Sequence, residues 1–87
     1  MATAIPQKTA ATAAWADLSG RRFFAWRMAV ACGEALRQVH QAAAQQADPD
    51  RAQALEKVDR LLRHELLRWV RRGEALDLIA DHLPQPG

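Results

Sequence analysis

Basic side chains gather in the C-terminal half of the sequence in a pattern that could bind phosphates. Between residues 57 and 72 there are six Lys or Arg and two acids, a local net charge of +4, whereas the whole chain carries +2. Five basic residues follow one another at intervals of three or four, which places them on one face of a helix: Lys57, Arg60, His64, Arg68 and Arg71. Such a row can track nucleic-acid phosphates. It can equally be the solvated side of a helix, so both interpretations stay open.

Residues that could bind a metal or act as a nucleophile are scattered along the chain. Cys32 is the single cysteine, and His40, His64 and His82 have no second histidine four residues away, as a two-histidine metal motif on a helix requires. We find no glycine-rich phosphate loop, nucleophile elbow or paired catalytic carboxylates. The sequence therefore predicts a non-enzymatic protein with no metal site, no cofactor and no small-molecule substrate.

An apolar stripe is the second kind of candidate site. Phe23, Trp26 and Val30 recur at helical spacing, and Gly33 continues nearly the same face, where its missing side chain would let another helix approach. We predict that these four residues form a protein interface. The alternative is that a terminal segment of the chain folds over the stripe as ordinary core.

The first long helix that must position these residues is predicted over residues 21–47, which contain no proline. A main apolar stripe runs along this segment at steps of three and four and is expected to face another element: Phe24, Met28, Cys32, Ala35, Val39 and Ala42. On this stripe Cys32 is expected to be a small buried hydrophobe. Residues 1–17 are predicted to be a tail, partly helical or disordered, and residues 18–87 a single helical domain.

A second helix is predicted after the sequence Asp48-Pro49-Asp50. Proline disfavours helix for the residue before it and suits the first helical position, so Asp48 is the expected N-cap. Gly73 is the expected C-cap, or else a mild bend, and residues 74–83 form a short third helix. Glu65 lies beside the apolar stripe of this segment and is expected at its edge, near Arg68 or Arg72. The stripe itself is Leu55, Val58, Leu62, Leu66 and Trp69.

The predicted fold is all-α: an antiparallel helical hairpin with a short C-terminal helix, completed to a bundle by dimerisation. The short connection near residue 48 makes the two long helices antiparallel neighbours. Two helices cannot enclose a core, and a chain of 87 residues buries a marginal share of its surface. One cysteine also excludes an intramolecular disulfide, so self-association is the expected source of further stability.

We therefore expect a small interaction protein, acting as an adaptor, inhibitor or accessory subunit through its apolar stripe. Its partner would be a second copy of the chain or a larger protein. The alternative is a nucleic-acid-associated regulator that uses the basic residues between Lys57 and Arg71. No apolar stretch approaches the roughly 20 residues that span a bilayer. The single cysteine and the lack of an apolar signal segment lead us to expect a cytoplasmic protein.

Overall fold

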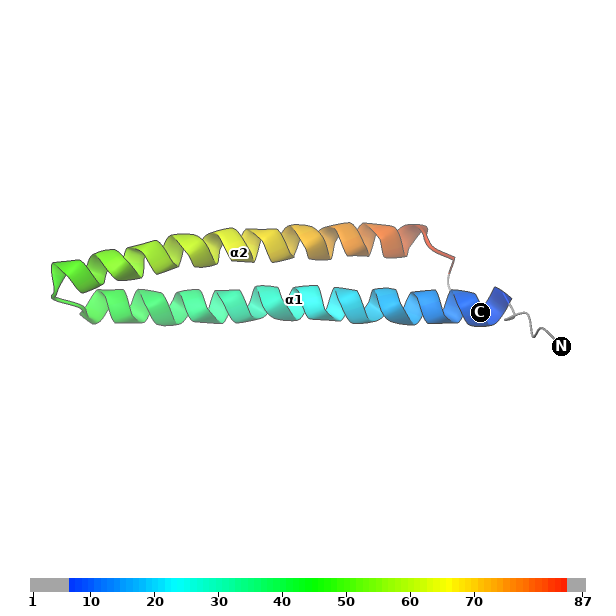
Figure 1. Ribbon diagram of the computed structural model, residues 1–87, viewed down its shortest axis with the longest axis horizontal. Helices are drawn as coiled ribbons and strands as arrows, with labels where there is room; N and C mark the ends of the chain where they lie inside the picture. The colour runs from blue at the N-terminus through cyan, green and yellow to red at the C-terminus, as the bar shows by residue number, and fades with distance from the viewer. Residues whose placement is uncertain (1–6, 85–87) are drawn as a thin grey trace.

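The computed structural model describes residues 7–84, with side chains from residue 12 onward, and this part of the chain is an antiparallel pair of long helices. Helix α1 spans Gln7–Gln45 and helix α2 spans Pro49–His82. The two helices lie side by side over most of their length, so that the start of α1 and the end of α2 meet at the same end (Figure 1). The predicted all-α hairpin is confirmed.

The turn between the helices follows the predicted capping chemistry. Asp48 is the N-cap of α2, its side-chain Oδ1 accepts a hydrogen bond of 3.0 Å from the backbone N–H of Asp50, and Pro49 opens the helix. The carbonyl of Asp48 also accepts the first bond of the helix, from Ala52 N at 2.9 Å. The carboxylate satisfies an N–H group that has no partner within the helix.

Two predicted helix ends differ from the structure. Helix α1 begins at Gln7 and continues through Gly20, so the part of the predicted tail that the structure describes is helical, while residues 1–6 lie outside the described range. Helix α2 passes through Gly73 without a break and ends with Leu83 as its C-cap, so the separate C-terminal helix is absent from the described residues. Gly73 is buried and neither caps nor ends a helix, and the residues on both sides of it are good helix formers.

The contact between the helices is a seam of small and medium-sized side chains. The buried residues of α1 are Leu18, Ala25, Ala29, Cys32 and Leu36. The predicted inward stripe was therefore wrong at Phe24, which is 54% exposed, whereas Cys32 is buried as expected. Its members Met28, Ala35 and Val39 are half-buried. Ala25 is 1% exposed, and the larger Phe24 and Trp26 beside it diverge to opposite sides of the seam. Small residues at the centre let the two helix backbones approach closely.

Two carboxylates of α2 fix the register of the hairpin. Near its open end Asp77 binds Arg22, with 2.8 Å between Oδ1 and Nε. Near the turn Asp59 Oδ1 lies 2.5 Å from Nε2 of His40, and its Oδ2 accepts a 2.8 Å hydrogen bond from Arg63 Nε. The bond to Arg63 lowers the pKa of Asp59, and the His40 contact adds to this effect, with partial desolvation opposing it. The Arg22–Asp77 and His40–Asp59 contacts each join the two helices, and in each pair the two residues are nearly equally far, along the chain, from the start of α2.

The hairpin is too thin to enclose a core. The molecule measures 71 × 26 × 14 Å, and its radius of gyration of 20.1 Å far exceeds the ~12 Å expected for a compact chain of this length. Within the described residues the largest buried side chains are leucines, and nine large hydrophobic side chains are exposed. Neither described helix contains an apolar stretch that could cross a membrane. Much of the apolar surface of the chain therefore lies on the two broad sides of the hairpin.

Candidate functional site

The predicted interface forms one broad side of the hairpin, which we call the Phe23 face: Phe23, Trp26 and Val30. Phe23 is 68% exposed and Val30 is 61% exposed, so neither residue belongs to the seam. They line a shallow groove of about 560 Å³ whose polar rim consists of Ser19, Arg22, Arg27 and Asp77. Gly33 does not line this groove, but it is open, since a Cβ added there would meet nothing within 4 Å.

Trp26 differs from the other members of the Phe23 face because it also packs within the hairpin. Its indole lies over Gly73, where an added Cβ would be only 2.6 Å from Cε2 of the ring. Its Nε1 donates a hydrogen bond of 3.2 Å to Asp77 Oδ2. The prediction left open that a terminal segment covers the stripe, and Trp26 does contact Gly73 and Asp77 in the C-terminal part of α2, whereas Phe23 and Val30 remain exposed. The indole of Trp26 is half-buried and forms the floor of the groove between the exposed side chains of Phe23 and Val30.

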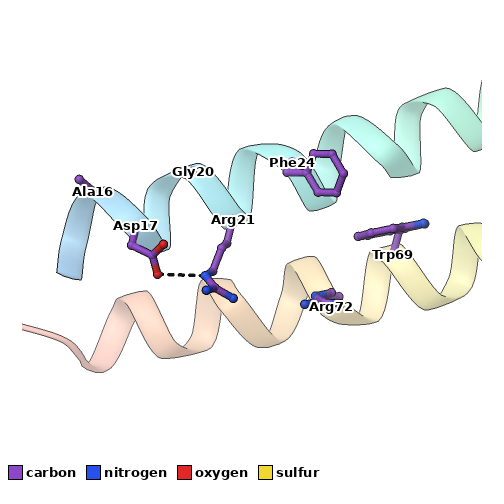
Figure 2. Close-up of a pocket in the computed structure, with 7 residues that line it drawn as sticks. All are labelled: Ala16, Asp17, Gly20, Arg21, Phe24, Trp69 and Arg72. Carbon is purple, nitrogen blue, oxygen red and sulfur yellow. Dashed lines mark hydrogen bonds and ion pairs between the residues drawn. The ribbon is translucent and has the colours of Figure 1, made fainter. Parts of the chain in front are cut away.

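The opposite broad side carries a second groove that was not predicted from the sequence. Phe24 of α1 and Trp69 of α2 meet edge to face, with 5.5 Å between ring centroids and an angle of 83°. Figure 2 shows these two rings from facing helices, with Ala16 and Gly20 leaving space farther along α1 and an ion pair between Asp17 and Arg21 at the rim. The groove has a volume of about 510 Å³. We call this side the Trp69 face.

A guanidinium and a carboxylate lie next to the ring of Trp69. Cζ of Arg72 is 5.8 Å from the ring centroid, a cation–π arrangement. Glu65 lines an adjoining hollow with Trp69 and Arg72, and its Oε1 lies 3.6 Å from Nη1 of Arg68. The side chain of Glu65 is 46% exposed, so the prediction of an edge residue that reaches Arg68 is confirmed.

The predicted phosphate-binding residues form a row along the outer side of α2, which we call the basic row. All five are exposed: Lys57, Arg60, His64, Arg68 and Arg71. Arg60 and Arg68 have acidic neighbours on the same helix, at 3.8 Å from Glu56 and 3.6 Å from Glu65. The middle of the row surrounds the half-exposed side chain of Leu67. The charge of the row is therefore partly neutralised by acids of the same helix, and its middle borders one apolar side chain.

The described residues show no group of three or more His, Cys, Asp or Glu side chains that could hold a metal ion. Cys32 is buried in the seam, and His82 Nδ1 lies 2.8 Å from the carbonyl oxygen of Leu78 one turn earlier. The carboxylates that border the two grooves, Asp17 and Asp77, are both engaged by arginine. The chemistry that these grooves offer is apolar contact with a rim of guanidinium groups.

Comparison with family models, with curated proteins and with solved structures finds no match to this chain.

Proposed function

We propose that this protein is a small non-enzymatic helical interaction protein, which acts by packing an exposed apolar helix face against helices of a partner. The observation that carries the proposal is the placement of its large apolar side chains. Nine of them are exposed in the described part of the chain, whereas the buried hydrophobic residues there are no larger than leucine. Contiguous apolar surface on a small protein is typical of an interaction site.

The Phe23 face is the part of this surface that fits a helix of another protein. Phe23 and Val30 stand on either side of the half-buried Trp26 and leave a groove along α1, as in helix-in-groove recognition. Arg27 lines the same groove, and no carboxylate of the described residues lies within ion-pair distance of it. The occupant that we propose is an amphipathic helix with apolar residues along one side and an acidic residue that meets Arg27.

The test compares Phe23→Asp with Gln53→Asp, because both positions are exposed and only the first lies in the groove. A partner purified with the tagged wild type is expressed separately, and its affinity is measured by isothermal titration calorimetry. We expect Phe23→Asp to weaken binding by at least about 100-fold, since a charge in a desolvated apolar contact costs several kcal/mol, and Gln53→Asp to leave it unchanged. Equal affinities for both variants would refute the proposal for this face.

The basic row supports a second candidate function, that of a nucleic-acid-associated regulator. Its side chains are exposed over four turns of α2, and Lys57, His64 and Arg71 have no ion pair with a described residue. Phosphate binding would weaken steeply as salt concentration rises. Titration of duplex and single-stranded DNA with the wild type and with a triple variant, Arg60→Glu, Arg68→Glu and Arg71→Glu, tests this function. Absence of binding by the wild type, or equal binding by a variant of unchanged helicity, would exclude it.

A further inference from the structure

Further exposed apolar side chains of α2 lie on both sides of Trp69, outside the groove that Figure 2 draws. Residues at helical spacing from Trp69 include two exposed apolar side chains toward the turn, Val58 and Leu61. On the other side Ile79 and Leu83 are also exposed at this spacing. One broad side of α2 thus presents an apolar row nearly as long as the helix, interrupted by Glu65 and Arg72.

This row has an internal symmetry about the midpoint between Arg68 and Trp69. A helix that packs antiparallel on a second copy of itself, across a twofold axis at that midpoint, brings together residues that are equally distant from it. At the midpoint itself, Arg68 of one copy lies level with Trp69 of the other. Farther out, apolar residues meet apolar residues, and Glu65 meets Arg72. The pairs at equal distances are Glu65 with Arg72, Leu61 with Leu76, and Val58 with Ile79.

The two charged residues on the row, Glu65 and Arg72, are placed so that a second copy could supply an ion-pair partner for each. No carboxylate of the described residues lies within ion-pair distance of Arg72, which rests against the ring of Trp69. Glu65 is half-exposed and reaches only Arg68, at 3.6 Å, which lies at the outer edge and belongs to the basic row. The twofold arrangement places Glu65 of each copy opposite Arg72 of the other, so that both charges gain a partner when the apolar row is covered.

The opposing helix α1 leaves room on the same side for this association. Ala16 and Gly20 line the groove there, and a Cβ added to Gly20 would meet nothing within 4 Å. Each broad side of the hairpin measures 71 by 26 Å. A contact over half of one side is therefore large enough for a standard interface, which buries about 800 Å² per partner. Face-to-face packing of two such hairpins encloses Phe24 and Trp69 in a four-helix bundle.

We propose that the Trp69 face binds a second copy of this chain in an antiparallel twofold dimer, in which Glu65 of each copy pairs with Arg72 of the other. This inference rests on the proposed function, because it names the partner for one of the apolar faces through which the protein acts. It differs from the dimer predicted through Phe23, Trp26 and Val30, and it leaves that face free.

The symmetry allows a charge-exchange experiment. In the Glu65→Arg variant each Glu65–Arg72 pair becomes two arginines, and in the Arg72→Glu variant it becomes two glutamates. Twofold symmetry repeats the repulsion, so we expect the dimer dissociation constant of each single variant to rise on the order of 100-fold. An equimolar mixture of the two variants restores both pairs, and the double variant restores them within one chain. Sedimentation velocity over a concentration series measures all four samples beside the wild type.

The proposal is supported if the wild type, the mixture and the double variant are dimers at concentrations where each single variant is monomeric. Circular dichroism verifies that every variant remains helical. A wild type that is monomeric throughout the series would overturn the dimer, and so would single variants that dimerise as tightly as the wild type. Either result leaves the proposed interaction function standing, since that function is tested separately by Phe23→Asp. If the dimer is overturned and Phe23→Asp also leaves partner binding unchanged, the proposed interaction function is refuted as well.

Discussion

Replacing Gly73 with alanine tests the packing of the hairpin most directly. In an exposed helix interior this change stabilises a protein by about 1 kcal/mol, because alanine has the higher helix propensity. At Gly73 the new Cβ would meet three atoms of the Trp26 indole, at 2.6 Å, 2.9 Å and 3.0 Å. The ring would have to move away from α2 by several tenths of an ångström.

The expected cost exceeds the gain in helix propensity. Forcing an extra carbon into a packed contact costs about 1–3 kcal/mol. Moving the indole also disturbs the 3.2 Å hydrogen bond from Trp26 to Asp77, a further loss of about 1 kcal/mol for a part-exposed bond. After subtraction of the helix gain of about 1 kcal/mol, we expect Gly73→Ala to lower the free energy of unfolding by about 1–3 kcal/mol.

Gly33→Ala is the matched control, because Gly33 also lies inside a helix and an added Cβ meets nothing within 4 Å. Urea unfolding at one fixed protein concentration, followed by far-UV circular dichroism, should show Gly33→Ala to be stabilised by up to about 1 kcal/mol. In a Trp26→Ala background the obstacle is gone, so Gly73→Ala should become stabilising there. If Gly73→Ala stabilises the otherwise wild-type protein as Gly33→Ala does, the indole does not lie on Gly73 and the described seam is wrong.

Three further predictions concern the polar contacts of the hairpin. Asp77→Ala should lower the free energy of unfolding by about 1–2 kcal/mol in urea titrations, because it removes the bonds to both α1 residues, whereas the exposed Asp81→Ala should change it little. The bond from Arg63 lowers the pKa of Asp59. The ionised carboxylate of Asp59 therefore stabilises the fold fully above about pH 4, the unfolded-state value, and this contribution is lost as the pH falls through the lowered folded-state pKa. Between about pH 5 and pH 2 the stability of Asp59→Asn should therefore fall less steeply than that of the wild type, as thermal melts over this range would show. Asp48→Ala should cost about 1 kcal/mol through loss of the N-cap, and an unchanged melting temperature would show that the 3.0 Å bond to the backbone contributes nothing.

The hairpin could be predicted from the sequence because its signals are local. Asp48 and Pro49 determine where the second helix begins, and helical periodicity on both sides determines the element type. The position of the seam could not be predicted in the same way. Alanine is only weakly hydrophobic, so the sequence pattern predicted that the larger neighbours of Ala25 and Ala29 would face inward, whereas the two alanines are the buried residues. The two aromatic stripes of the sequence are instead the two flanks of one alanine-rich contact.

Gly73 and Asp77 show what a single sequence cannot supply. Gly73 follows two arginines in a pattern that is typical of a helix C-cap, and its real role depends on an indole 47 positions away in the chain. Asp77 was one of several acids on the last segment, and its distinction is a pair of bonds to Arg22 and Trp26. Such pairings between distant residues depend on the register of the helices. Periodicity determines which residues share a face but leaves the register open.

The two proposed interfaces are compatible because they use opposite sides of a molecule that is 14 Å thick. Twofold packing through Trp69 covers Phe24 and the apolar row of α2, while the groove between Phe23 and Val30 stays on the outside of each copy. The dimer would thus present two identical grooves facing away from each other, one on each broad surface of the bundle. A partner that carries two matching helices, or two partners held together, would then bind with avidity rather than with the affinity of a single groove. Weakening the dimer by the Glu65 and Arg72 exchanges would lower that avidity while leaving the affinity of each groove unchanged. The Phe23 face would thus bind the partner, and the Trp69 face would set how many grooves bind it together.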